Sequence, residues 1–90
     1  MTPITYSKRA FKYLRDLQPK QAKQIALGIM ALSYDSISQD CKHLSGYPDH
    51  FRITLGEYRA IFERSSNLIN VKIIGPRNDD AVYKDFANLN

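Results

Sequence analysis

The first part of the chain has the hydrophobic periodicity of a helix. From Ser7 onward, apolar residues recur every three or four positions, which is the spacing of one helix face. This stripe consists of Ala10, Leu14 and Leu17, with Phe11 and Tyr13 beside it. Lys8, Lys12 and Arg15 share a second, basic face of the same helix. Residues 3–7, which come just before, are β-prone and predict a short N-terminal strand.

A second helix is predicted directly after the first. Pro19 ends the first pattern and suits the first position of a new helix, which we expect to run to about Tyr34. Its apolar stripe consists of Ala22, Ile25, Ala26, Ile29 and Leu32. Gly28 within this helix costs about 1 kcal/mol relative to alanine, and its missing side chain would let another element approach closely. Residues 35–49 are rich in turn formers and predict an irregular connector.

The period changes to two in the second half, as in β-strands. In residues 50–55, Phe51, Ile53 and Leu55 alternate with His50, Arg52 and Thr54. Gly56 and Glu57 suit a two-residue hairpin loop with glycine in the first central position. Residues 58–65 and 68–74 predict two further strands, and Gly75–Pro76 ends the last one. Residues 79–86 predict a short closing helix with Asp79 or Asp80 at its N-cap.

This order of elements predicts one domain that spans residues 1–90. It is an α+β, two-layer fold with an N-terminal strand, a helical hairpin, an antiparallel three-stranded meander and a short C-terminal helix. We expect the helices to cover one face of the sheet and the N-terminal strand to join its edge. A chain of 90 residues is of the right length for one domain.

Composition narrows the classes of function. The chain is 43% hydrophobic and 24% charged, which is typical of a globular protein. No apolar run approaches the roughly 20 residues of a membrane span, so we expect a soluble, cytoplasmic protein without membrane contact. Cys41 is the only cysteine, so an internal disulfide is excluded, and we expect an unreactive thiol. Two histidines and one cysteine without ligand spacing predict no metal site and no cofactor.

The charge pattern points to a polyanionic partner. The formal net charge is +4, which suits nucleic acid or an acidic protein segment. If residues 56 and 57 form the hairpin loop, Thr54 faces Arg59 and Arg52 faces Ile61. Arg52 and Arg59 then project from one sheet face as diagonal neighbours about 7–8 Å apart, close enough to hold one phosphodiester. The alternative is a solvated sheet face, with Glu63 as the nearest carboxylate for His50 or Arg52.

Two stretches of the sequence resemble a known protein family. They are HLSGYPDHFRITLGEYRAIFE and VKIIGPRNDDAVY, residues 43–63 and 71–83. In order, they contain a Leu-x-Gly, a strand of alternating basic residues, a Gly-x-Tyr-Arg hairpin, and an arginine followed by a tyrosine. This set resembles the RelE/ParE superfamily of bacterial type II toxin–antitoxin toxins, and the RelE branch in particular.

The resemblance implies an activity and a set of site residues. RelE-like toxins are ribosome-dependent mRNA endonucleases, or mRNA interferases, which inhibit translation by cutting the message in the ribosomal A site without a metal ion. Arg59 matches the arginine that stabilises charge on the scissile phosphate, and Arg77 matches the arginine near the leaving oxygen. Tyr83 matches the tyrosine that orients the substrate nucleotide, and Arg52 occupies the first of two positions that are lysines in the best-known members. Lys8, Lys12 and Arg15 then form a candidate surface for ribosomal RNA, or a solvated helix face.

The second of those lysine positions is Thr54, which departs from the family pattern. Threonine is no general base, and the pKa of arginine is too high for that role. His50 is the chemically natural replacement, because its pKa is ordinarily close to neutral. Glu63, Asp79 and Asp80 are alternatives, and the ribosome is a further source of catalytic groups.

Three functions remain open at this stage. The leading one is the ribosome-dependent mRNA endonuclease. A non-nuclease toxin of the ParE kind, which acts on DNA gyrase, is favoured by the missing basic residue at Thr54. The third is an inactive relative that only binds an antitoxin. In each case the expected partner is a cognate antitoxin protein, and the endonuclease would also bind the ribosome and mRNA.

Overall fold

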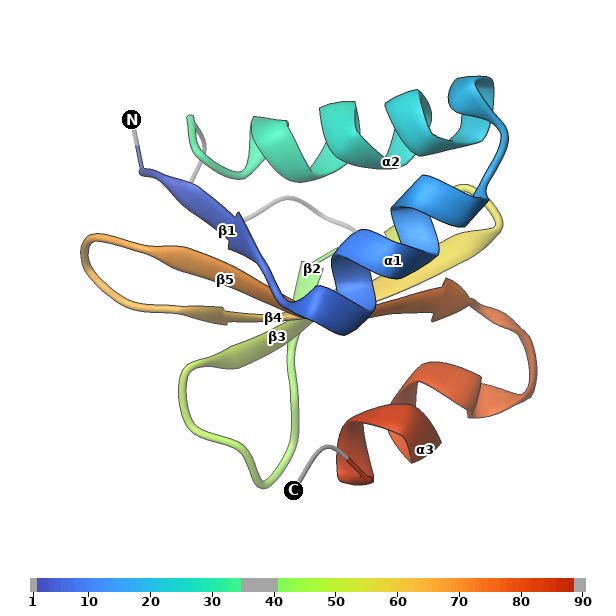
Figure 1. Ribbon diagram of the computed structural model, residues 1–90. Coiled ribbons are helices and arrows are strands. Elements are labelled where there is room, and N and C mark those ends of the chain that lie inside the picture. Colours follow the sequence, from blue (N-terminus) through green and yellow to red (C-terminus); the bar gives the residue numbers. More distant parts are fainter. Residues whose placement is uncertain (1, 35–40, 89–90) are drawn as a thin grey trace.

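The computed structural model of the chain describes residues 2–34 and 41–88, except for the side chain of Asp79. Its elements follow one another as β1 (Ile4–Tyr6), α1 (Lys8–Asp16), α2 (Pro19–Ala31), β2 (Cys41–His43), β3 (His50–Leu55), β4 (Tyr58–Arg64), β5 (Ile69–Pro76), the 3₁₀ helix η1 (Asn78–Asp80) and α3 (Ala81–Ala87). The predicted α+β class, the helical hairpin and the meander are confirmed (Figure 1).

The helical hairpin begins at a capped helix end. Ser7 is the N-cap of α1, where its Oγ accepts a hydrogen bond from the backbone N–H of Ala10 at 3.0 Å and satisfies a free amide of the first turn. The same hydroxyl donates to the carbonyl of Lys72 at 2.6 Å, which ties α1 to β5. Pro19 occupies the first turn of α2, as predicted. The hairpin is therefore positioned by the chain that precedes it and by the last strand.

The sheet has five strands in the order β1-β5-β4-β3-β2. Strands β2 to β5 are antiparallel neighbours, whereas β1 pairs with β5 in parallel, so the sheet is mixed. The N-terminal strand joins the sheet edge, as predicted. Strand β2 was not predicted, because it is only three residues long and lies in a segment rich in turn formers. The meander therefore has four strands rather than three.

A bulge in β5 changes which side chains reach each sheet face. The pairing of β4 with β5 shifts between Ile61 and Phe62, which pair with Ile73 and Val71. Lys72 is the additional residue, and its side chain contacts Glu63 on the same face as Ile73. A bulge places two successive side chains on one side of a strand. Strict alternation would have placed Ile73 on the same face as Val71, in the larger core.

Each sheet face has its own hydrophobic core. The larger core lies under α1 and α2 and is formed by Ala10, Ile25, Ile29, Leu32, Cys41, Ile53, Ala60, Phe62, Ile69, Val71 and Ile74. The smaller core lies on the opposite face, under α3, and is formed by Leu44, Ile61, Ile73 and Val82. Figure 1 shows the hairpin above the sheet and α3 below it. The closing helix thus does not join the layer of the other two helices, which the sequence alone had placed together on one face.

Two glycines allow close packing between elements. A side chain at Gly28 of α2 would collide with the Leu55 side chain of β3, as the sequence had suggested for an approaching element. A Cβ at Gly75 of β5 would lie 2.9 Å from Cγ1 of Val82, which is buried in α3. Each glycine therefore sets the distance between a helix and the sheet.

The role of Gly28 is testable by a double-mutant cycle. We expect Gly28→Ala to lower the free energy of unfolding by about 1 kcal/mol, because the new methyl group overpacks the contact with Leu55. In a Leu55→Ala background the same change should raise it by up to about 1 kcal/mol, because alanine is the better helix former. Urea unfolding followed by circular dichroism measures both. Equal effects in the two backgrounds would contradict the packing role.

Candidate functional site

The strand register places the two predicted arginines on one face of the sheet. Thr54 pairs with Arg59, and Arg52 pairs with Ile61, as the two-residue loop had predicted. This is the face on which α3 packs against β5 and β4. Arg59 lies beside the first turn of α3, and Arg52 is its diagonal neighbour one strand further away.

Arg59 is held tightly at the centre of this arrangement. Its side chain is only 16% exposed, and its guanidinium carbon lies 5.6 Å from the centre of the Tyr83 ring. One terminal nitrogen lies 3.9 Å from the Oδ1 of Asp80. Its Nε is buried and has no hydrogen-bond partner among the described residues. A buried donor without an acceptor is unfavourable, so this cation retains hydrogen-bonding capacity.

Tyr83 reaches Arg59 because α3 packs directly on the sheet. Val82 of α3 fills the space that Gly75 leaves open, and Gly75 is the strand partner of Arg59. The Tyr83 ring packs against the smaller core and covers the guanidinium. A cation over an aromatic face is attracted by the ring quadrupole. Asp80 lies at the N-cap position of α3, where Asp79 or Asp80 had been predicted, but its side chain makes no capping hydrogen bond.

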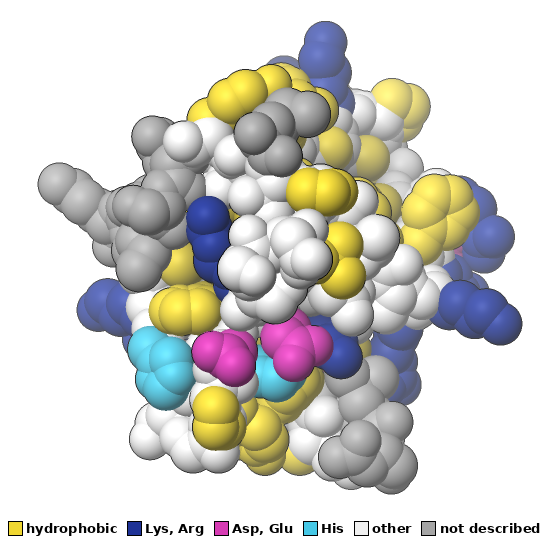
Figure 2. Space-filling view, turned by 90° about the vertical axis from the view of Figure 1, so that its left-hand side faces the viewer, with side chains coloured by type: hydrophobic (Ala, Val, Ile, Leu, Met, Phe, Trp, Pro, Cys, Tyr) yellow, Lys and Arg dark blue, Asp and Glu magenta, His cyan; other side chains and the backbone are white. Residues whose placement is uncertain are grey.

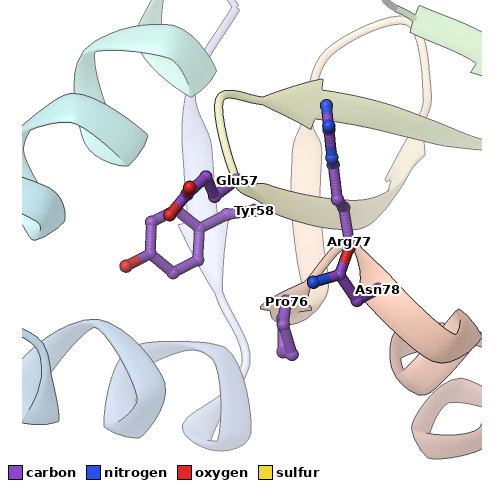
Figure 3. A pocket seen from close by; sticks show the side chains of 5 residues that line it. All are labelled: Glu57, Tyr58, Pro76, Arg77 and Asn78. Carbon is purple, nitrogen blue, oxygen red and sulfur yellow. The ribbon is translucent and has the colours of Figure 1, made fainter.

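Arg77 lies at the edge of a cavity at the end of β5. It is exposed, and its backbone N–H donates to the carbonyl of Glu57 at 3.1 Å, which fixes the chain beside the hairpin loop. The cavity has a volume of about 290 Å³. Figure 3 shows Glu57 and Tyr58 on one side of it and Arg77 and Asn78 on the other. The guanidinium of Arg77 is thus free to meet a ligand that approaches from solvent.

Lys42 is a basic residue of this face that sequence reasoning missed. It pairs with Arg52 across β2 and β3, so the two side chains project from the same face. Neither forms an ion pair with any residue that the structure describes. The sequence pattern did not indicate the position of Lys42, because its strand is only three residues long and was not predicted. With β2 in place, the basic surface, which consists of Arg52, Arg59, Arg77 and Lys42, extends one strand further than expected.

His50 and Glu63 lie at the other end of β3 and β4. They are strand partners, but Glu63 forms an ion pair with Lys72 at 3.5 Å, which is neither of the partners proposed from sequence. His50 lies four residues from Thr54 along β3, which corresponds to about 13 Å. The structure therefore does not bring His50 together with Arg59. Its role as general base remains a prediction.

An aromatic cluster surrounds His50. Its ring contacts Tyr47 and Phe86, with centroid distances of 6.1 and 5.4 Å. Its Nδ1 lies 2.8 Å from the carbonyl oxygen of Pro48. Since a carbonyl only accepts, Nδ1 carries a proton, and the neutral ring has its lone pair on Nε2. Figure 2, which shows the side of the molecule that lies on the left in Figure 1, has histidine and acidic side chains next to each other.

The basic face of α1 lies apart from the arginines of the sheet. Lys8, Lys12 and Arg15 are all exposed, and α1 packs on the opposite sheet face. Arg15 forms an ion pair with Asp16 at 3.6 Å. Lys12 and Asp16 also line a cavity of about 230 Å³ that Asp85 of α3 reaches. These cations thus form a separate surface, with acidic residues beside it.

Three further features concern metal binding, membrane-spanning helices and the reactivity of the cysteine. The described residues contain no group of three or more histidine, cysteine, aspartate or glutamate side chains that could hold a metal ion. None of the helices in this part of the chain is both long and apolar enough to cross a bilayer. Burial raises the pKa of the Cys41 thiol, although Arg64 opposes the shift. A thiol with a raised pKa forms less of the reactive thiolate.

Comparison with known proteins identifies the fold. No protein-family model and no curated protein matches the sequence. An archaeal RelE–RelB complex from Pyrococcus horikoshii contains a chain that is 22% identical, with a TM-score of 0.75 over 87% of this chain and 97% of that one. The chain has the RelE fold. The intact E. coli RelBE toxin–antitoxin complex gives a TM-score of 0.74 at 20% identity, over 87% of this chain and 99% of that one. The isolated E. coli RelE toxin gives 0.74 at 21% identity, over 97% of this chain and 96% of that one.

The α3 helix is held by its packing on the smaller core, and the contribution of Tyr83 to this packing can be measured. We expect Tyr83→Ala to lower the free energy of unfolding by about 2–3 kcal/mol, because it removes packing on the smaller core and the contact with Arg59. Tyr83→Phe keeps the ring and should change the free energy of unfolding by less than about 0.5 kcal/mol. Thermal and urea unfolding test both variants. A stable Tyr83→Ala variant would show that the ring does not hold α3 in place.

Proposed function

We propose that this chain is the toxin of a type II toxin–antitoxin system and acts as a ribosome-dependent mRNA endonuclease. The observation that carries the proposal is that Arg59, in contact with Tyr83, lies at the same end of the sheet as Arg77, with Arg52 as its diagonal neighbour. Three guanidinium groups and an aromatic ring suit a phosphodiester and its base. The sequence resemblance and the RelE fold support the same assignment.

The proposed reaction is an internal transesterification of the message. The ribose 2′-oxygen attacks the adjacent phosphorus, the bond from phosphorus to the 5′-oxygen breaks, and the products are a cyclic phosphate and a 5′-hydroxyl. Negative charge builds up on the phosphoryl oxygens in the transition state. Arg59 is suited to stabilise that charge, because it is fixed and largely shielded from water. Arg77, which is exposed, would meet the leaving oxygen.

The proton from the 2′-hydroxyl has no single assigned acceptor. Thr54 lies opposite Arg59 and is no base. His50, Glu63 and Asp80 are distributed along the sheet face and the first turn of α3, and the side chain of Asp79 lies outside the described part of the structure. A group supplied by the ribosome is compatible with this arrangement, because a toxin that acts only in the A site needs no complete set of its own.

Two partners follow from this proposal. The first is a cognate antitoxin, because similar chains have been solved as RelE–RelB complexes. The second is the ribosome with its message, for which the exposed Lys8, Lys12 and Arg15 of α1 would provide a second contact with RNA. A protein that acts on ribosomes works in the cytoplasm.

Cleavage of ribosome-bound message tests the proposal directly. We expect primer extension after induced expression to show cuts at fixed positions within codons, reduced at least about tenfold by Arg77→Ala through loss of electrostatic stabilisation. Arg77 is exposed, so its removal should leave the fold intact. Lys23→Ala removes an exposed cation of α2 and is the matched control. Intact message with the native chain would contradict the proposal.

A second toxin activity is favoured by one observation. The missing basic residue at Thr54 leaves Arg59 without a base opposite it, which suits a ParE-like toxin that acts on DNA gyrase without cleaving RNA. Intact message together with cleaved plasmid in a gyrase assay would support this function. Harmless expression without an antitoxin would instead indicate an inactive relative that binds an antitoxin.

Lys42 should contribute to RNA binding if Arg52 does. Neutralisation of one phosphate of a single strand changes the slope of log affinity against log salt by about 0.7. We therefore expect Lys42→Ala to reduce that slope by about this amount for binding to ribosomes that carry message, measured by filter binding. Lys42→Arg should preserve it, and Lys23→Ala should leave it unchanged. The same slope for Lys42→Ala and the native chain would exclude a phosphate contact at this position.

A further inference from the structure

We propose that Asp80 is the internal counter-ion of Arg59, and that an RNA phosphate takes its place when substrate binds. This inference rests on the proposed function, in which Arg59 binds a phosphate. It concerns the contact that Arg59 makes before the substrate arrives. The carboxylate of Asp80 and a phosphodiester carry the same charge and accept hydrogen bonds from the same donors.

The backbone of Asp80 is held in an unusual conformation. Its φ and ψ angles are 53° and 29°, which is the left-handed region. Non-glycine residues rarely adopt this region, although aspartate and asparagine tolerate it better than most. The residue stands at the N-cap position of α3, where a carboxylate ordinarily accepts a backbone hydrogen bond. It makes no such bond and lies near Arg59 instead, so capping does not explain its position.

Arg59 does not depend on Asp80 for its own position. Its backbone lies between Thr54 and Gly75 in the sheet, the ring of Tyr83 covers its guanidinium, and its side chain is 16% exposed. These contacts would remain if the carboxylate were lost. The buried Nε has no acceptor among the described residues, so the carboxylate does not satisfy the whole group. Asp80 therefore neutralises charge more than it fixes geometry.

The ion pair itself is loose enough to be displaced. The two atoms are 3.9 Å apart, which is longer than a charge-assisted hydrogen bond, and the Asp80 side chain is 74% exposed. An ion pair at this separation, in which one partner is highly exposed, contributes little. A phosphate that Arg77 and Arg52 also contact would outcompete the single carboxylate. An anion that contacts only Arg59 would gain much less binding energy when it replaces the carboxylate. Asp80 therefore selects for ligands that contact the whole basic surface.

The variant Asp80→Asn isolates this effect. It keeps the size of the side chain and the tolerance for a left-handed backbone, and it removes only the charge. Asp85→Asn removes the same charge from an exposed position of α3 and is the matched control. The probe is a single-stranded RNA oligonucleotide with 2′-O-methyl groups, which cannot be cleaved, and binding is followed by fluorescence anisotropy.

We expect Asp80→Asn to bind this RNA about twofold to fivefold more tightly than the native chain, as the loss of one weak ion pair allows. Asp85→Asn should bind with native affinity. In an Arg59→Ala background, Asp80→Asn should have no effect. Weaker binding by Asp80→Asn would overturn the proposal, because Asp80 would then position Arg59. Native affinity of Asp80→Asn would overturn it too, because the carboxylate would then not compete with RNA. An equal gain in both backgrounds would also overturn it, because it would indicate a general charge effect.

A second measurement separates this inference from the proposed function. The Nε–H signal of Arg59 in the ¹⁵N NMR spectrum is titrated with inorganic phosphate. We expect it to shift at about twofold to fivefold lower phosphate concentration in Asp80→Asn. If the native chain binds no RNA but this difference is present, the proposed function fails and the counter-ion role stands. If RNA binds and the phosphate titrations of the two proteins coincide, the counter-ion role fails alone.

Discussion

A row of three residues across the sheet, Thr54, Arg59 and Gly75, is the arrangement on which the site depends. Gly75 has no side chain, so Val82 packs into the space above β5 and α3 lies close against the sheet. The first turn of that helix then reaches the neighbouring strand and covers the guanidinium of Arg59. A larger residue at position 75 would push the helix away and uncover the arginine. Packing on one strand thus determines the surroundings of a charge on the next.

The cations on this face are neutralised to different degrees, so the positive charge is distributed unevenly along the sheet. At one end Lys72 and Glu63 pair with each other. In the middle Arg59 has a loosely bound carboxylate. Arg77 and Arg52 have no ion-pair partner among the described residues. The positive potential available to a polyanion is therefore concentrated near the β3–β4 hairpin loop, where the cavity beside Arg77 opens. This is the end of the sheet that a substrate phosphate is proposed to enter.

Much of the β-meander could be predicted because its connection is short. A two-residue loop leaves one register for its strands, so the pairs Thr54–Arg59 and Arg52–Ile61 followed from the position of Gly56 and were confirmed. The helical hairpin followed in the same way from its apolar stripes. Strand β2 could not be found, because three residues give no alternation to detect. Lys42 was missed with it, since only its pairing places it beside Arg52.

The sequence by itself determined the helices, the register of β3 and β4, and the shared face of Arg52 and Arg59. Helix periodicity and loop length act over a few neighbouring residues, so the local pattern is sufficient for them. Only the tertiary structure decided that α3 packs on the face opposite the hairpin, and that Asp80 turns toward Arg59. It also gave Glu63 a partner, because the pairing of Glu63 with Asn70 in β5 places Lys72 beside it on the same face. Such contacts join residues far apart in sequence, and they depend on which surfaces pack together.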